Sequence, residues 1–210
     1  MESFEKKKHW EKIYQTKEGK DVSWYEPTPV TSLSFLKQFN IAAAAKIIDI
    51  GGGDSFFIDN LLDLGFQDIT VLDISEKALE RAKARLGDRA HNVKWIVSDV
   101  ATFQPIEQYD FWHDRATFHF STRENEIDNY LTTVHRSLKQ TGILVMGTFS
   151  EEGPNKCSGL DIRQYSETTM TERLARFFEK IKCITVVHLT PFDTIQNFIF
   201  CSFRKAQTAL

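Results

Sequence analysis

The sequence predicts an α/β fold, in which helices cover both faces of a doubly wound, seven-stranded, mostly parallel sheet that ends in an antiparallel hairpin. Short apolar runs of strand type alternate with helical segments between residues 46 and 149, as in parallel sheets with crossover helices. The first run, 46–50, leads straight into a turn of three glycines. Only Pro191-Phe192-Asp193 separates the last two runs, whereas a parallel crossover takes about a dozen residues. These two runs are therefore predicted to pair as an antiparallel hairpin.

The N-terminal segment, residues 1–40, is predicted to form a helical lid with helices over 4–17 and 30–39. Four large aromatic side chains fall within sixteen residues of this otherwise polar segment: Trp10, Tyr14, Trp24 and Tyr25. They could be ordinary packing of a helix on the sheet. Their density in a polar segment favours a cover over a ligand pocket.

The core is predicted to run from 46 to 204, with parallel strands at 46–50, 69–73, 93–97, 109–113 and 143–149. Apolar residues mark the buried faces of three helices between them: Phe57, Ile58, Leu61 and Leu62; Ala78, Leu79, Ala82 and Leu86; Ile127, Tyr130, Leu131, Val134 and Leu138. Gly65 ends the first helix, Ser75 caps the second, and Ser121-Thr122-Arg123-Glu124 matches a capping box before the third. A helix over 167–179 and strands at 181–189 and 194–203 complete the chain.

Composition is that of an ordinary globular protein and argues against two kinds of partner. With 210 residues and no Pro/Gly/Ser linker, the chain is expected to form a single domain over 1–210 and to be a monomer. The net charge of −3 and the pI near 6.1 argue against a nucleic-acid partner, which normally requires a basic surplus. No stretch approaches the roughly 18 consecutive apolar residues of a membrane span.

Three cysteines occur at wide spacings, Cys157, Cys183 and Cys201, and no two of them have the spacing of metal ligands. We therefore expect no metal site, reduced thiols and a cytoplasmic location. Cys157 lies in the loop after the fifth strand, close to where an acceptor would enter. A structural thiol is favoured over a nucleophile there, because the sequence fixes no base beside it.

The glycine turn and the acidic residue after the next strand describe a nucleoside pocket. Gly51-Gly52-Gly53 lets the backbone turn sharply and approach a ligand closely, because a Cβ would block both. Asp73 stands beside this turn, where its carboxylate can accept hydrogen bonds from ribose hydroxyls. Two alternatives stay open: Asp49 could only tie down the amides of the turn, and Asp73 could only cap the next helix.

The order of these motifs resembles the class I S-adenosylmethionine-dependent methyltransferases, over about residues 46–204. That family has a Rossmann-like, seven-stranded sheet with a reversed hairpin. Asp49-x-Gly51-x-Gly53 looks like its first motif, Asp73-Ile74 like its ribose-binding position, and Asp99-Val100 like its adenine-contacting pair. The resemblance implies that these residues bind S-adenosylmethionine, with S-adenosylhomocysteine as the product, and that Trp10, Tyr14 and Trp24 close over it. Asp99 could instead serve only to form its turn.

Two segments carry a closer resemblance and leave two acceptor classes. Trp10-x-x-x-Tyr14 followed by Trp24-Tyr25 is similar to the opening of a branch that includes protein-lysine methyltransferases acting on elongation factors and on a mitochondrial enzyme. Asp114-Arg115-Ala116-Thr117 aligns with the Asp-Lys-Gly-Thr of that branch, with Lys and Gly replaced. The run Asp-Arg-Ala-x-Phe-His-Phe at 114–120 also resembles bacterial methyltransferases of unassigned substrate. A small-molecule acceptor is slightly favoured over a protein lysine.

Asp114 and His119 are the predicted catalytic residues. The resemblance places Asp114 facing the methionine end of the cofactor or the acceptor, where a carboxylate can hold an ammonium group. His119 would line the acceptor side and remove a proton, since its reference pKa lies near neutrality. Strand alternation points His113 to the face opposite Asp114, and a core role is favoured for His113.

Two other classes of function compete with methyl transfer. A nicotinamide-dependent oxidoreductase would have the same order of strand, glycine turn and acidic residue. In this chain, however, Phe56 stands at the position of its third glycine, and the catalytic Tyr-x-x-x-Lys motif is absent from the sequence. A non-catalytic module that only binds the cofactor is disfavoured by the intact set of pocket acids. The sequence thus predicts the cofactor more firmly than the acceptor.

Overall fold

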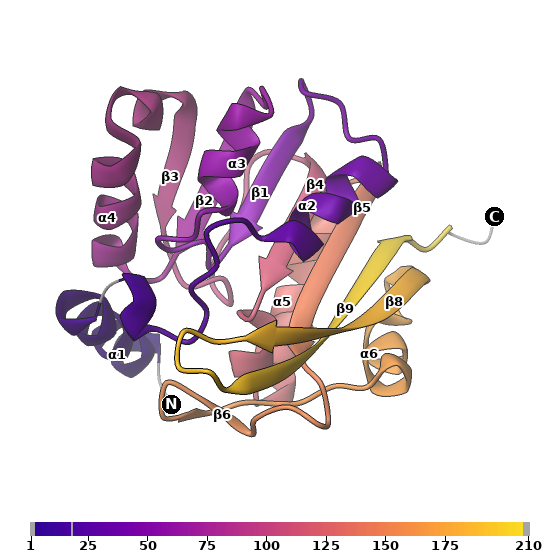
Figure 1. The fold of residues 1–210 in the computed structure, drawn as a ribbon. Coiled ribbons are helices and arrows are strands. Elements are labelled where there is room, and N and C mark those ends of the chain that lie inside the picture. Colours follow the sequence, from indigo (N-terminus) through magenta and orange to yellow (C-terminus); the bar gives the residue numbers. More distant parts are fainter. Residues whose placement is uncertain (1–2, 18, 208–210) are drawn as a thin grey trace.

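The computed structural model of the protein describes residues 3–17 and 19–207. Its centre is a seven-stranded sheet of order β3-β2-β1-β4-β5-β9-β8 (Figure 1). The strands are β1 (Lys46–Ile50), β2 (Asp68–Asp73), β3 (Val93–Val97), β4 (Tyr109–Arg115), β5 (Leu138–Phe149), β8 (Phe178–Leu189) and β9 (Ile195–Lys205). The first five are parallel, and β9 runs antiparallel to both β5 and β8. The predicted sheet with a reversed hairpin is confirmed.

Helices cover both faces of the sheet, because successive side chains of the buried strands point to opposite faces. α2 (Val30–Gln38), α3 (Phe57–Asp63) and α4 (Glu76–Leu86) pack against the face that carries Ile47, Ile69 and Phe111. α5 (Glu124–Ser137) and α6 (Glu167–Leu174) pack against the face that carries Ile48 and Trp112. The same alternation along β4 determines which of its polar side chains reach the cavity described below.

Some predicted caps and boundaries are confirmed and others are wrong. Ser75 caps α4 by accepting a hydrogen bond from the Ala78 amide, as predicted. The capping box at Ser121 is not formed, because Ser121 ends a 3-10 turn, η3 (Phe118–Phe120), and α5 begins after Arg123 without a side-chain cap. Strand β5 begins at Leu138, a residue that the sequence predicts on the buried face of the preceding helix. Strand β8 begins within the predicted helix 167–179. Pairing with neighbouring strands extends these elements beyond their local pattern.

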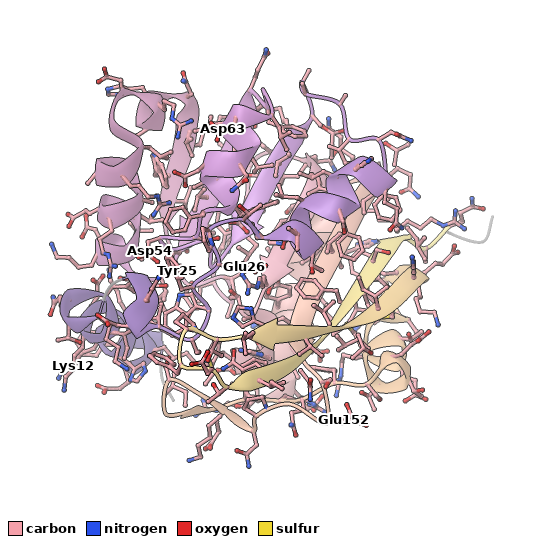
Figure 2. The ribbon with its side chains drawn as sticks, in the orientation of Figure 1. Lys12, Tyr25, Glu26, Asp54, Asp63 and Glu152 are labelled. Carbon is pink, nitrogen blue, oxygen red and sulfur yellow. A yellow bond between two sulfur atoms is a disulfide. The ribbon has the colours of Figure 1, made fainter. Side chains whose placement is uncertain are left out.

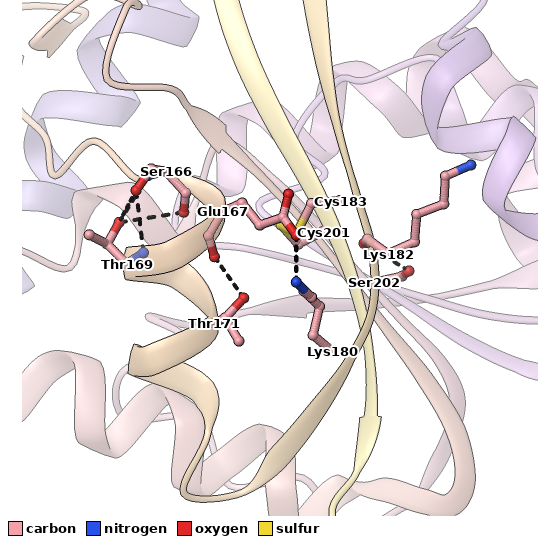
Figure 3. Close-up of a disulfide and its surroundings, with 9 residues drawn as sticks. All are labelled: Ser166, Glu167, Thr169, Thr171, Lys180, Lys182, Cys183, Cys201 and Ser202. Atoms are coloured by element: carbon pink, nitrogen blue, oxygen red, sulfur yellow. Dashed lines mark hydrogen bonds and ion pairs between the residues drawn. A yellow bond between two sulfur atoms is a disulfide. The ribbon is translucent and has the colours of Figure 1, made fainter.

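The expectation of three reduced thiols is wrong for two of them. Cys183 on β8 lies directly opposite Cys201 on β9, with Cα atoms 4.1 Å apart, and the two form a disulfide (Figure 3). Cys157 is free and buried. Both cysteines lie nine residues from Phe192, the middle residue of the predicted turn, so the register of the predicted hairpin places them opposite each other. Cys157 belongs to a short hairpin that the sequence did not predict, β6 (Lys156–Cys157) with β7 (Leu160–Asp161).

The N-terminal helix α1 (Ser3–Thr16) docks where α4 begins (Figure 1). The Glu11 carboxylate accepts hydrogen bonds from the Glu76 amide at 2.7 Å, the Lys77 amide at 3.2 Å and the Ser75 hydroxyl at 3.1 Å. A carboxylate is favourable there because the first amides of a helix have no partner within the helix and carry partial positive charge. A second helical turn, η1 (Gly19–Asp21), and a loop lead from α1 to α2.

Candidate functional site

One cavity opens at the edge of the sheet where the parallel strands end. Its walls come from the carboxyl ends of β1 to β5, from β9, and from the aromatic residues of α1 and the loop after η1. Most cofactor residues predicted from the sequence line it: Trp10, Tyr14, Trp24, Asp49, Gly51, Gly52, Asp73, Ile74, Asp99 and Val100. Positions spread over ninety residues of chain therefore meet in one place, as expected where parallel strands end together.

The glycine turn after β1 forms a floor that larger residues could not form. Gly51 has a φ of +64°, and a Cβ on it would stand 1.8 Å from the Thr117 hydroxyl oxygen. Gly53 has a φ of +48° and lies behind the cavity wall, where a Cβ would approach the Tyr14 hydroxyl to 2.7 Å. Both positions need glycine for conformation and for space. The turn therefore packs tightly against Thr117 and Tyr14, and its residues Gly51 and Gly52 line the cavity.

Asp73 ends β2 beside this turn and is almost completely buried. One carboxylate oxygen accepts a hydrogen bond from the Ser75 amide at 2.8 Å, so Asp73 helps to form the turn into α4 and also lines the cavity. Burial raises the pKa of the Asp73 carboxyl to about 7, and hydrogen bonds from the Ser75 and Gly53 amides oppose this rise. Near neutral pH the group therefore changes from a neutral carboxylic acid to a carboxylate, which accepts hydrogen bonds from hydroxyl groups.

Asp99 and Val100 lie at the end of β3, next to Ile74 along the wall of the cavity. The Asp99 carboxylate accepts a hydrogen bond from the Ala101 amide at 2.9 Å, which fixes the turn. The alternative of turn formation is therefore confirmed, and the position of Asp99 in the cavity wall leaves adenine contact as a prediction. Val100 supplies an apolar surface there and is 8% exposed.

The aromatic side chains of the N-terminal segment form a cluster over the cavity. The Trp10 ring lies 6.2 Å from Tyr14, 5.9 Å from Trp24 and 5.3 Å from Phe120, measured between ring centroids. Trp10, Tyr14, Trp24 and Phe120 all line the cavity. Tyr25 packs against Phe56 outside this cavity, with ring centroids 5.6 Å apart. Three of the four predicted aromatics therefore cover the ligand space.

His113 is buried with both ring nitrogens hydrogen-bonded, as the core role favoured from the sequence predicts, and it also lines the cavity. Its Nδ1 lies 2.6 Å from an Asp49 carboxylate oxygen, and its Nε2 lies 2.8 Å from the Ser32 hydroxyl. All three side chains are buried, and all three line the cavity. The chain Asp49–His113–Ser32 joins the first motif to α2, which follows the N-terminal segment. No periodicity in the sequence indicated Ser32.

Asp114 points to the other face of β4 and is not among the residues that line the cavity. It accepts hydrogen bonds from the amides of Thr117 at 2.9 Å and Phe118 at 3.2 Å and from the Tyr130 hydroxyl. Burial raises the pKa of its carboxyl to about 6. The predicted position facing the cofactor or acceptor is therefore not found, because strand alternation turns the side chain toward α5.

His119 also lies away from the cavity. It is fully buried between the rings of Phe120 and Phe149, at centroid distances of 4.6 and 4.9 Å, and its Nδ1 accepts a 3.4 Å hydrogen bond from the Phe149 amide. Its Nε2 has no partner among the described residues, and burial lowers the pKa of the ring to about 3. The expected place on the acceptor side is taken by its neighbour Phe120.

Apart from Cys157, which was expected close to where an acceptor would enter, the residues at the end of the cavity beyond the glycine turn were not indicated by the sequence. Arg115, one step past Asp114, points to the same face as His113 and lines the cavity. Phe149, Phe198 and Gln196 come from β5 and β9, and Cys157 comes from the β6–β7 hairpin. Burial raises the pKa of the Cys157 thiol to about 11, which keeps it protonated at neutral pH. Alternation along β4 was the one signal that could have identified Arg115.

A family model described as "Methyltransferase domain" matches residues 47–142, the segment from β1 into β5 that supplies the glycine turn and the strand-end acids. The proteins behind this model, the relatives below and the fold neighbours are class I S-adenosylmethionine-dependent methyltransferases, the family that the sequence resembles. It is 28% identical over 165 residues to the eEF1A lysine and N-terminal methyltransferase of Mus musculus, covering 69% of this chain and 23% of that protein. Its fold matches N-methyltransferase NodS from Bradyrhizobium japonicum WM9, solved with S-adenosyl-L-homocysteine, at a TM-score of 0.66 and 17% identity, with 83% and 85% of the two chains covered.

A second relative of the chain names a different acceptor. Malonyl-acyl-carrier-protein O-methyltransferase 1 of Ilyobacter polytropus is 31% identical over 117 residues, covering 55% of this chain and 40% of that protein. The chain thus spans less than half the length of these two relatives. The family uses S-adenosylmethionine. Within the described residues, no helix is long and apolar enough to cross a membrane, and no group of three or more His, Cys, Asp or Glu is placed to hold a metal ion.

Proposed function

We propose that this methyltransferase transfers the methyl group of S-adenosylmethionine to a small molecule that enters the covered end of the cavity. The observation that carries the proposal is the continuity of the cavity: the glycine turn, Asp73 and Asp99 line one part, and Arg115 and the phenyl rings line the other. The glycine turn fits the cofactor, because Gly51 and Gly52 line the cavity at the end of β1, where a glycine backbone permits the close approach of a ligand. Asp73 would hold the ribose hydroxyls, and Val100 and Ile74 the adenine.

The residues of the chain would contribute position and the exclusion of water. When bound, S-adenosylmethionine supplies a methyl group already activated on a sulfonium, so little acid–base chemistry is needed from the protein. Trp10, Tyr14 and Trp24 would close the site to water, and Asp49, held by His113, would orient a cationic group near the glycine turn. Asp114 and His119 would support the turn after β4 from behind the cavity wall.

A protein lysine is the second candidate acceptor. The relative in Mus musculus carries that activity in its name, and this observation favours the lysine class. Against it stands the Arg115 guanidinium, because a lysine ammonium entering the same end would meet a like charge. Lysate fractions incubated with S-adenosylmethionine labelled on its methyl group distinguish the two. Label in small metabolites supports the proposal, and label in protein supports the alternative.

A calorimetric titration with S-adenosylhomocysteine tests the cofactor part of the proposal separately. We expect binding, and a melting temperature that rises with ligand concentration, because a ligand of the folded state stabilises it by mass action. Nicotinamide dinucleotides should not bind, and their binding in place of S-adenosylhomocysteine would contradict the proposal.

The proposal includes a monomeric protein in the cytoplasm without a nucleic-acid partner, and the net charge of −3 supports the last of these three. The Cys183–Cys201 disulfide bears on location, because disulfides are rare in the cytosol. Alkylation of thiols at the moment of lysis, followed by mass spectrometry, tests this part. A cytoplasmic protein should yield alkylated Cys183 and Cys201.

A further inference from the structure

Arg115 extends from β4 toward β9, away from the glycine turn. Its guanidinium carbon lies 5.8 Å from the centroid of the Phe198 ring on β9. The strand order β1-β4-β5-β9 places that ring on the side of β4 opposite to β1, whose end carries the glycine turn. The guanidinium therefore leans toward the β9 side of the cavity, although the pairing of Ile50 with Asp114 places the Arg115 backbone next to the start of the glycine turn.

The guanidinium is buried but keeps donors to spare. Arg115 is 14% exposed at its side chain, and one terminal nitrogen lies 2.9 Å from a carboxylate oxygen of Glu26. Glu26, labelled in Figure 2, belongs to the loop after η1 that covers the cavity. A guanidinium has five N–H donors in a planar fork that matches a carboxylate in two-point fashion. The pair with Glu26 therefore leaves the fork able to take a second acid.

The walls around this charge are flat and apolar. The rings of Trp24, Phe120, Phe149 and Phe198 line the cavity, and Phe149 and Phe198 lie 4.8 Å apart between centroids. Gln196 adds an amide that can donate or accept a hydrogen bond. Flat aromatic surfaces favour a planar ligand, and the Arg115 guanidinium among them favours one with a negative charge.

We propose that the methyl acceptor is a small planar acid whose carboxylate pairs with Arg115 between these rings. The proposal rests on the proposed function and names the acceptor class of the same site. Glu26 then acts as a competitor: it neutralises Arg115 in the free protein and weakens the binding of an acid by its negative charge. An amine of the same shape is excluded, because its charge would lie against the guanidinium without a free carboxylate to offset it.

Benzoate, benzyl alcohol and benzylamine are the probes, since they share a ring and differ in charge. Binding is measured by calorimetry and by melting temperature, on the free protein and on its complex with S-adenosylhomocysteine. We expect benzoate to bind, benzyl alcohol to bind at least tenfold more weakly, and benzylamine not to bind. Equal binding of benzylamine and benzoate would overturn the proposal.

Three variants test whether the charges of Arg115 and Glu26 set the affinity for benzoate. Arg115→Gln should weaken benzoate binding at least tenfold, whereas Glu26→Gln should strengthen it several-fold by removing the competing carboxylate. Arg204→Gln is the matched control, because Arg204 pairs with Glu179 at 3.0 Å and is not among the residues that line the cavity. It should leave benzoate binding unchanged. Benzoate binding that survives Arg115→Gln would contradict the proposal.

A further comparison separates the acceptor from the cofactor's own carboxylate. 5′-Methylthioadenosine lacks the amino-acid part of S-adenosylhomocysteine. Arg115→Gln should leave the affinities for both nucleosides unchanged. A loss for S-adenosylhomocysteine but not for 5′-methylthioadenosine would assign Arg115 to the cofactor and overturn the proposal. Failure of both nucleosides to bind the unmodified protein would instead refute the proposed function, while the benzoate titration of the free protein still reports on Arg115.

Discussion

The part of the cavity beside the glycine turn and the part around Arg115 are built in different ways. The first part uses the ends of β1, β2 and β3, whose polar residues follow directly after buried strands. The second part uses β4, β5 and β9, the β6–β7 hairpin and the loop before α2, which are far apart in the chain. In the first part the acids face the cavity, whereas near the second part Asp114 and His119 face the protein interior. Polar residues at strand ends can therefore serve as ligand contacts or as internal supports, and strand direction decides which.

Asp114→Ala gives the largest expected effect and tests the supporting role. Removing the carboxylate leaves the amides of Thr117 and Phe118 and the Tyr130 hydroxyl without their acceptor inside the protein. We expect the free energy of unfolding to fall by about 2–4 kcal/mol, from urea titrations. Asp114→Asn, which retains an acceptor, should cost less. An unchanged stability together with a large loss of S-adenosylhomocysteine affinity would return Asp114 to the ligand.

Asp73→Ala tests the opposite role in the first part of the cavity. Ribose hydroxyls would lose a buried acceptor, so the affinity for S-adenosylhomocysteine should fall by about 1–3 kcal/mol in calorimetry. Benzoate binding to the free protein should stay the same, because Asp73 lies at the other end. A folded Asp73→Ala protein with unchanged affinity for S-adenosylhomocysteine would show that Asp73 does not contact the ribose.

The raised pKa of Asp73 makes cofactor binding depend on pH. Burial holds this pKa at about 7, so the carboxylate that accepts from hydroxyls forms only as the pH rises through that value. S-adenosylhomocysteine affinity should increase about tenfold between roughly pH 6 and roughly pH 8. The same shift means that the free folded protein binds the proton more tightly than the unfolded chain, whose pKa is about 3.9, so this group makes the protein less stable as the pH rises between the two values. Asp73→Asn should flatten the affinity profile, and a profile that stays steep in that variant would assign the titration to another group.

His119→Asn gives the smallest expected effect. The asparagine oxygen can replace Nδ1 as acceptor for the Phe149 amide but cannot remove a proton. Turnover should therefore stay within about twofold of the unmodified enzyme, a change far below the loss of a hundredfold or more expected for a general base. A loss of that size in a folded His119→Asn protein, with cofactor affinity intact, would show that His119 reaches the acceptor after all.

The cofactor end was predictable because its signals are local. A strand, a glycine turn and an acid at the next strand end occupy neighbouring positions in the chain, and the parallel order of the strands brings them to one edge. The aromatic residues Trp10, Tyr14 and Trp24 were found for a similar reason, since they stand out in a polar segment. By contrast, Ser32 lies on α2 and meets His113 only through packing across 81 positions of sequence.

Four features could be predicted from the sequence: the sheet, the reversed hairpin, the glycine turn and the acids at the ends of β2 and β3. Each of them depends on periodicity or on backbone conformation within a few residues. Packing between distant segments decided that His113 and Arg115 face the cavity while Asp114 faces α5, and that His119 is enclosed by Phe120 and Phe149. Alternation shows which residues of a strand share a face, but which face receives a ligand depends on the helices and loops that cover the sheet. Those coverings come from distant parts of the chain, and their contacts leave no period in the sequence.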